Sequence, residues 1–181
     1  MVIRILLAPF TALWHGLLRL LRWMTGGLYD LATKHQEEIP FADLLEGDFT
    51  GYEPEDVMEA VDCMDGYQFE AFSALLLCRC GFDQAEITKG SGDQGVDILA
   101  RKEDITYAFQ CKNVTSKLGN TPIQEVTAGR AFYRCHIGIV LTNSFFTEGA
   151  EELAGANLVL LWDRDRLRSM VEKAMLADFK N

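Results

Sequence analysis

The stretch 95–112, GVDILARKEDITYAFQCK, decides the fold, because it predicts two β-strands joined by a short turn. Apolar residues dominate 96–101 and alternate with polar ones over 105–112, which is typical of strands that lie against a core. Glu103 and Asp104 between them suit a hairpin turn, although they are not one of the strongest two-residue turn pairs. The two strands are therefore expected to pair antiparallel.

Three polar side chains interrupt this apolar pattern. Asp97 is an acidic residue inside the first strand, and Gln110 and Lys112 stand two apart on the second, so the latter two share a face. A buried carboxylate needs a partner, because an unpaired buried charge is costly. If the strands form a hairpin, these side chains converge. A structural ion pair between Asp97 and Lys112 would explain the spacing equally well.

The same residues also suit a metal site. Divalent cations prefer oxygen ligands, which Asp97, the amide of Gln110 and a backbone carbonyl at Cys111 could supply, with Glu70 as a further carboxylate. A bound metal ion lowers the pKa of its water ligand and offsets charge on a phosphate. Lys112 could orient or deprotonate that water, or stabilise the transition state.

Working outward, the second half of the chain predicts alternating elements. Helices are expected at 66–80, 121–134, 147–154 and 163–179, and strands at 85–89, 96–101, 105–112, 137–141 and 158–162. A meander of strands followed by crossover units implies an α/β fold, with a mixed sheet flanked by helices on both sides.

Composition supports a globular protein but not a typical DNA-binding module. The 181 residues are 49% hydrophobic and 24% charged, which argues against disorder across the chain. The formal net charge of −10 is unlike that of most nucleic-acid-binding domains, which are basic. Much of the negative charge lies between residues 37 and 65, a stretch without Lys or Arg, and so outside the predicted chemistry.

The first 63 residues divide into two segments. Residues 1–29 have apolar positions at helical spacing and arginines opposite, which predicts an amphipathic helix that anchors to a membrane surface or packs on protein. Residues 30–63 are acidic with scattered apolar positions, so we expect a solvated linker, with an interaction element as the alternative. The domain of interest would then span 64–181, in a cytoplasmic protein that is membrane-associated if the first helix binds lipid.

Five sequence blocks together resemble the catalytic domain of Mrr-type restriction endonucleases, which belong to the PD-(D/E)XK nuclease superfamily. The blocks are Gly66-Tyr67-Gln68-Phe69-Glu70, residues 90–98 (GSGDQGVDI), Phe109-Gln110-Cys111-Lys112, Val140-Leu141-Thr142-Asn143-Ser144 and Leu161-Trp162-Asp163. The resemblance covers about residues 64–171 and implies a restriction-endonuclease-like three-layer sandwich that cuts DNA with Mg²⁺ or Mn²⁺.

The resemblance also implies roles for single residues. Asp97 matches the metal-binding aspartate, Lys112 the catalytic lysine and Glu70 the acid of the first helix, while Gln110 stands where most of the superfamily has Glu or Asp. Candidate contacts to DNA phosphates are Lys89, Ser91, Lys117 and Arg130, although solvated surface positions explain each of them as well. A homodimer is plausible, since double-strand cleavage needs two sites or sequential nicks.

Two other functions fit the same pattern. The domain could bind nucleic acid without cutting it, or it could serve as a membrane-tethered interaction module that keeps the fold. No reader domain for modified DNA is recognisable in residues 1–64, which sets the chain apart from many Mrr-type proteins.

Overall fold

The computed structural model describes residues 41–88 and 94–178. In chain order the elements are α3 (Phe41–Glu46), α4 (Pro54–Asp62), α5 (Gly66–Arg79), β1 (Gln84–Ile87), β2 (Ile98–Lys102), β3 (Ile105–Lys112), α6 (Thr121–Phe132), β4 (Ile137–Thr142), α7 (Glu148–Asn157), β5 (Val159–Trp162) and α8 (Arg164–Asp178). The described ranges contain no helix that combines the length and the apolar character needed to cross a bilayer.

One mixed sheet organises the described residues, with its strands in the order β1-β2-β3-β4-β5. The first three strands form an antiparallel meander, and β3, β4 and β5 run parallel to one another. The hairpin expected between β2 and β3 is present, with Ile98 opposite Phe109 and Lys102 opposite Ile105. The central strand β3 therefore joins the antiparallel half of the sheet to its parallel half.

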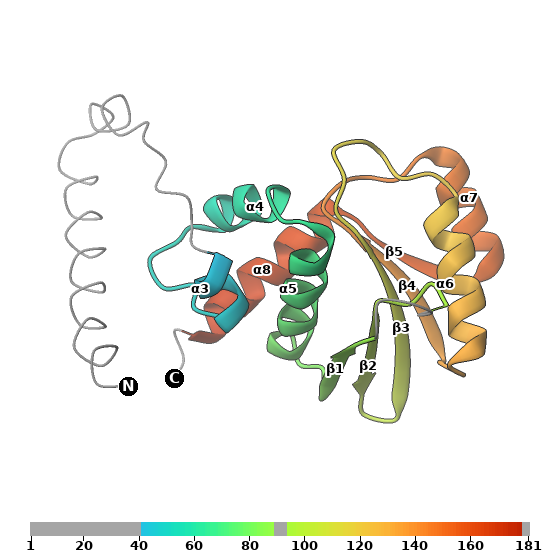
Figure 1. Ribbon diagram of the computed structural model, residues 1–181, viewed down its shortest axis with the longest axis horizontal. Coiled ribbons are helices and arrows are strands. Elements are labelled where there is room, and N and C mark those ends of the chain that lie inside the picture. Colours follow the sequence, from blue (N-terminus) through green and yellow to red (C-terminus); the bar gives the residue numbers. More distant parts are fainter. Residues whose placement is uncertain (1–40, 89–93, 179–181) are drawn as a thin grey trace.

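Helices cover both faces of the sheet, as Figure 1 shows, so the fold has three layers. The face toward α5 and α8 holds the larger core, which includes Phe69, Phe109 and Leu167. The opposite face packs on α6 and α7 through a second cluster that includes Ala108, Ile123 and Val140. Because alternate residues of a strand point to opposite faces, neighbouring residues of β3 contribute to different cores.

The predicted α/β sandwich is confirmed, and most element boundaries fall within a few residues of those expected. The strand 105–112 is observed with the same bounds. Helix α5 begins after Asp65, whose side chain accepts a hydrogen bond from the backbone N–H of Gln68, as in a capping box. Turn residues and the periodicity of apolar residues are therefore enough to predict the elements that carry the site.

The linker prediction is wrong for residues 41–63. Leu44, Phe49, Val57 and Val61 are at most 3% exposed and belong to the same core as α5 and α8. The ring of Phe49 meets that of Phe72 edge-on, with centroids 6.4 Å apart. Acidic residues occupy the outer side of this stretch, which made it resemble a solvated tether. The predicted helix in residues 1–29 lies outside the described residues.

A polar cluster ties this N-terminal stretch to the sheet. Asp62, at the end of α4, receives two hydrogen bonds from Arg164 at 2.7 and 2.8 Å and one from Asn143 at 2.9 Å. The side-chain amide of Asn113, next to Lys112, donates to the carbonyls of Val61 and Met64 at 2.9 and 2.6 Å. The start of α5 is thereby fixed relative to the end of β3.

Candidate active site

Asp97 lies directly before β2 and continues its ladder. Its backbone N–H donates to the carbonyl of Phe109 at 2.8 Å, and its own carbonyl accepts from the N–H of Thr88 at 2.9 Å. The β2–β3 register, extended by one residue, sets Asp97 opposite Gln110. Residues opposite each other in an antiparallel pair point to the same face, so the predicted convergence of these two side chains is observed.

The Asp97 carboxylate is held by its neighbours on β3. The residue is only 7% exposed, and its Oδ2 accepts hydrogen bonds from the Gln110 side-chain amide and from the backbone N–H of Cys111, the latter at 2.6 Å. The contact with Cys111 therefore involves the N–H, whereas the sequence suggested the carbonyl oxygen as a metal ligand. Both donors fix the orientation of the carboxylate.

The side-chain amide nitrogen of Gln110 donates to Asp97, and the amide oxygen is a separate acceptor. Gln110 is 3% exposed, and its Oε1 is buried without a hydrogen-bond partner. Leaving a buried acceptor unsatisfied costs about 1–3 kcal/mol, so such an atom calls for an explanation. A cation, which coordinates oxygen atoms, or a hydrogen-bond donor would provide one.

The Cys111 thiol lies on the other face of β3, and its pKa is affected by the charges near the site. Burial raises the pKa of this thiol well above its ordinary value, and the nearby negative charges of Asp97 and Glu70 raise it further. The thiol is therefore protonated at neutral pH and is neither a nucleophile nor a thiolate ligand.

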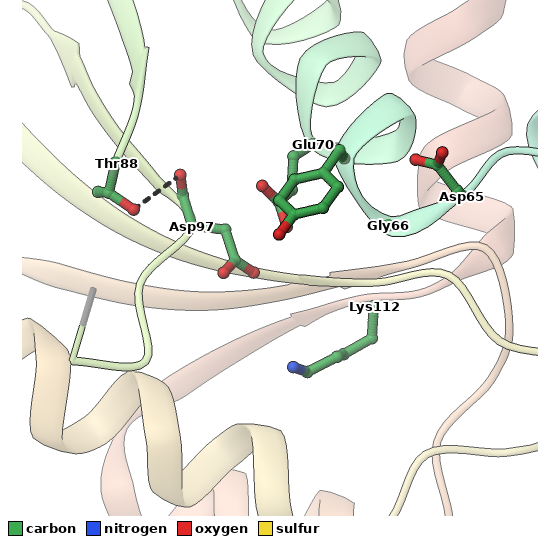
Figure 2. A pocket seen from close by; sticks show the side chains of 7 residues that line it. Asp65, Gly66, Glu70, Thr88, Asp97 and Lys112 are labelled. Carbon is green, nitrogen blue, oxygen red and sulfur yellow. Dashed lines mark hydrogen bonds between the residues drawn. The ribbon is translucent and has the colours of Figure 1, made fainter. Parts of the chain in front are cut away.

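An open cleft of about 500 Å³ brings the remaining predicted residues together. It is lined by Asp65, Gly66, Tyr67, Glu70, Thr88, Asp97 and Lys112. Figure 2 shows Glu70, from α5, on the opposite side of this cleft from Lys112, with the Asp97 carboxylate directed into the space between them. The structure thus places Asp97, Lys112 and Glu70 in one cleft, with Gln110 hydrogen-bonded to the first of them.

Lys112 forms an ion pair with helix α6 across the site. Its Nζ lies 3.4 Å from Oε2 of Glu125. This distance is longer than that of most hydrogen bonds but within the range of an ion pair. Both side chains are a little more than one-third exposed, so water screens the pair. The ion pair that the spacing suggested between Asp97 and Lys112 is replaced by this one, because α6 supplies its own carboxylate.

Two glycines allow the loop before Asp97 to pack closely against α6, because they have no side chain. Gly95 has φ +77°, and a Cβ added there would lie 2.8 Å from the carbonyl oxygen of Glu125. A Cβ on Gly129 would lie 2.3 Å from Val96 Cγ2 and 2.6 Å from the carbonyl oxygen of Gln94. Neither site can hold a larger residue without movement. From the family resemblance, Glu125 could be either a supporting polar residue or plain helix surface, and the structure pairs it with Lys112.

The predicted DNA-binding residues are not all near the cleft. Lys89 and Ser91 lie outside the described residues, and Lys117 is exposed in the segment after β3. Arg130 points elsewhere, since its Nη1 donates to the carbonyl of Leu158 at 3.3 Å and its stem lies over Gly138. Gly138 is four residues from the strand position opposite Lys112, roughly 13 Å along β4.

The donor set at the cleft suits a hard cation with few protein ligands. Asp97 and Glu70 offer carboxylates, and Gln110 Oε1 is a buried oxygen in need of a partner. Within residues 41–88 and 94–178 there is no cluster of three or more His, Cys, Asp or Glu side chains that could hold a metal ion. Magnesium commonly keeps several water ligands, so it requires few oxygen ligands from protein.

The sequence and the fold are both similar to those of restriction endonucleases. A family model of restriction endonucleases, specifically the Mrr-type catalytic domain, matches residues 61–171. The DNA modification-dependent restriction endonuclease AspBHI has a similar structure, with 14% identity, a TM-score of 0.52, and coverage of 70% of this chain and 38% of that one. The MspJI restriction endonuclease, in complex with a 27-mer oligonucleotide, has 18% identity, a TM-score of 0.51, and coverage of 70% and 32% respectively.

These structural similarities concern the fold. The match spans about a third of the length of each of the two enzymes, so the rest of each enzyme has no counterpart in it. Among curated proteins, none matches this chain in sequence.

Proposed function

The chain belongs to the restriction endonuclease family, and from this premise we propose that it is an endonuclease that hydrolyses phosphodiester bonds in DNA at the cleft between α5 and β3. One observation carries the proposal. Asp97 and Lys112 line the same cleft as Glu70, and the buried Asp97 carboxylate is oriented by Gln110. Acid, amide and amine side chains from adjacent strands therefore meet where a phosphate could bind.

We propose Mg²⁺ or Mn²⁺ as the cofactor, held by the carboxylates of Asp97 and Glu70 and by the amide oxygen of Gln110. When bound, such an ion lowers the pKa of a water molecule and offsets charge on the phosphate oxygens. The hydrogen bonds from Gln110 and Cys111 fix the direction of the Asp97 carboxylate. This orientation precedes substrate binding, so little reorganisation is needed during the reaction.

Lys112 supplies positive charge on the opposite side of the cleft from Glu70 (Figure 2). A phosphate that enters the cleft brings negative charge, which increases further as the water attacks. The ammonium group would stabilise that charge and hold the phosphate in the cleft. Glu125 keeps the ammonium on the α6 side of the cleft, which prevents it from collapsing onto the Asp97 carboxylate.

Cleavage of supercoiled plasmid DNA tests this proposal. Purified full-length protein with Mg²⁺ is expected to nick or linearise the plasmid, and EDTA is expected to stop it. Lys112→Ala should abolish cleavage, while Lys102→Ala, at the far end of the β2–β3 hairpin, should leave it intact. Equal cleavage by both variants would exclude the cleft as the active site. Retained DNA binding without any cleavage would favour a binding module of the same fold.

We further propose that targeting depends on segments outside the described residues or on another copy of the chain. Residues 1–29 are expected to bind a membrane surface or a protein, and a dimer would supply two sites for double-strand cleavage. Membrane fractionation with and without residues 1–29 separates the first two alternatives. Sedimentation of the full chain with and without DNA gives the oligomeric state.

A further inference from the structure

The charge of the cleft raises a problem for any polyanionic substrate. Among the described residues that line it, Asp65, Glu70 and Asp97 are acidic and Lys112 alone is basic. Lys112 is itself paired with Glu125, which offsets its charge. Contacts to DNA phosphates are the usual source of affinity, and this surface is poorly suited to provide many of them.

Tyr67 is a large aromatic side chain on the wall of the cleft, and it could contact substrate without relying on charge. It is 76% exposed, the most exposed aromatic residue in the described part of the chain, and it lines the cleft together with Asp97 and Lys112. An apolar ring left in water at this position has no role in the core. Its location on the wall of the proposed active site points to contact with substrate.

The backbone beneath Tyr67 is held firmly. Tyr67 is the second residue of α5, which begins with the reciprocal hydrogen bonds between Asp65 and Gln68, at 2.8 and 2.9 Å. Phe69, two residues after Tyr67, is fully buried and anchors this turn in the core. A tyrosine has only two side-chain torsions, so ordering it on a ligand costs little entropy. The ring is therefore a pre-positioned platform.

We propose that Tyr67 stacks on an unpaired base next to the scissile phosphate, so that the enzyme acts on single-stranded or locally unpaired DNA. The inference rests on the proposed endonuclease function and specifies its substrate. In an intact duplex each base face is covered by its neighbours, so the ring can stack only on a base that has left the helix. Stacking does not depend on sequence or on phosphate charge, which suits an acidic cleft.

Binding to short fluorescein-labelled oligonucleotides, measured by anisotropy in EDTA, tests the stacking contact without cleavage. The full chain should bind a single strand more tightly than the corresponding duplex. Tyr67→Ala should weaken single-strand binding by about 5- to 100-fold, the effect of losing one base–aromatic stack. Tyr67→Phe and Tyr67→Trp should stay within about twofold of the original protein, because both keep the ring.

The matched control is Phe132→Ala, an exposed aromatic residue at the end of α6 that does not line the cleft. This variant should bind like the original protein. Affinity should also fall only shallowly with salt, with a logarithmic slope that corresponds to about two phosphate contacts or fewer.

Three results would overturn the inference. One is unchanged single-strand binding by Tyr67→Ala, and another is a loss in Tyr67→Phe equal to that in Tyr67→Ala, which would assign the contact to the hydroxyl group. The third is duplex binding as tight as single-strand binding. Plasmid cleavage that depends on Lys112 would leave the proposed function standing in each of these cases, whereas absence of cleavage would refute the function whatever Tyr67 does.

Discussion

At the scale of single residues, the site depends on how Gln110 divides its two polar atoms. The amide nitrogen faces Asp97, and the buried oxygen lacks a partner. A carboxylate at this position would give a cation a charged ligand, but it would repel Asp97 when no cation is bound. We therefore expect the amide to stabilise the metal-free protein and to bind a cation less tightly than a carboxylate would.

Gln110→Glu tests this balance. In EDTA the variant should unfold at a lower temperature, with a stability loss of about 1–3 kcal/mol, because a hydrogen bond to a buried carboxylate is replaced by repulsion. Mg²⁺ or Mn²⁺ should raise its melting temperature more than that of the original chain. Differential scanning fluorimetry with and without metal measures both effects. Equal metal-induced shifts in the two proteins would argue against Gln110 as a ligand position.

Glu125 offers a second residue-scale test, because it contacts Lys112 without lining the cleft. Glu125→Gln should lower kcat by about 10- to 100-fold while KM changes little, since a misplaced ammonium stabilises the transition state less well. Glu125→Asp should recover part of the activity. The neighbouring exposed Gln124→Ala on the same helix serves as the control. A change in KM alone would show that Glu125 acts on DNA binding instead.

At the scale of elements, the site is assembled by the close packing of α6 against the loop before β2. Gly129 and Gly95 permit that packing, and Glu125 lies in the same part of the helix. The hairpin that brings Asp97 to Gln110 could be predicted, since strand period and turn position suffice for it. The pair of Lys112 with Glu125 could not, because it depends on the path of the chain through an eight-residue connection and on how α6 packs on the parallel strands.

Alanine substitution at two helical glycines tests that packing. One glycine lies against the loop before β2, and the other has free space around its Cα. Gly129→Ala should destabilise the fold by about 1–3 kcal/mol, because the added methyl group would overlap Val96. Gly155→Ala, in α7, should be neutral or stabilising by up to about 1 kcal/mol, because nothing lies within 4 Å of an added Cβ there. Urea unfolding gives both values. Equal stability of the two variants would contradict the close approach of α6.

At the scale of the whole molecule, the stretch 41–63 is part of the nuclease fold. Sequence patterning failed here because the helices are short and acidic residues are interspersed with the apolar ones. Burial of Leu44, Phe49 and Val57 depends on partners in α5 and α8, which no local pattern reveals. The cluster of Asp62, Asn143 and Arg164 then connects α4, the end of β4 and the start of α8.

This cluster predicts how stability depends on pH. Burial raises the pKa of Asp62, but hydrogen bonds from Arg164 and Asn143 outweigh it, so the folded pKa lies below the ordinary value of 3.8. The contribution is therefore fully present above pH 3.8 and is lost as pH falls through the folded pKa. Asp62→Asn should cost about 0.5–1 kcal/mol at neutral pH, since the pair is partly exposed.

Urea unfolding of Asp62→Asn beside the original chain measures that contribution at neutral pH and below pH 3.8. The difference in unfolding free energy should shrink toward zero in acid. A difference that stays constant with pH would show that the cluster acts through packing and not through charge.

The central claim is that the cleft around Asp97 carries out phosphodiester hydrolysis, and the single-turnover rate of plasmid nicking in Mg²⁺ tests it most directly. Asp97→Ala should reduce that rate by about 1,000-fold or more, because the oriented carboxylate is lost. Asp104→Ala, in the exposed turn between β2 and β3, should cleave at the original rate. Nicking by Asp97→Ala at the rate of Asp104→Ala would contradict the account.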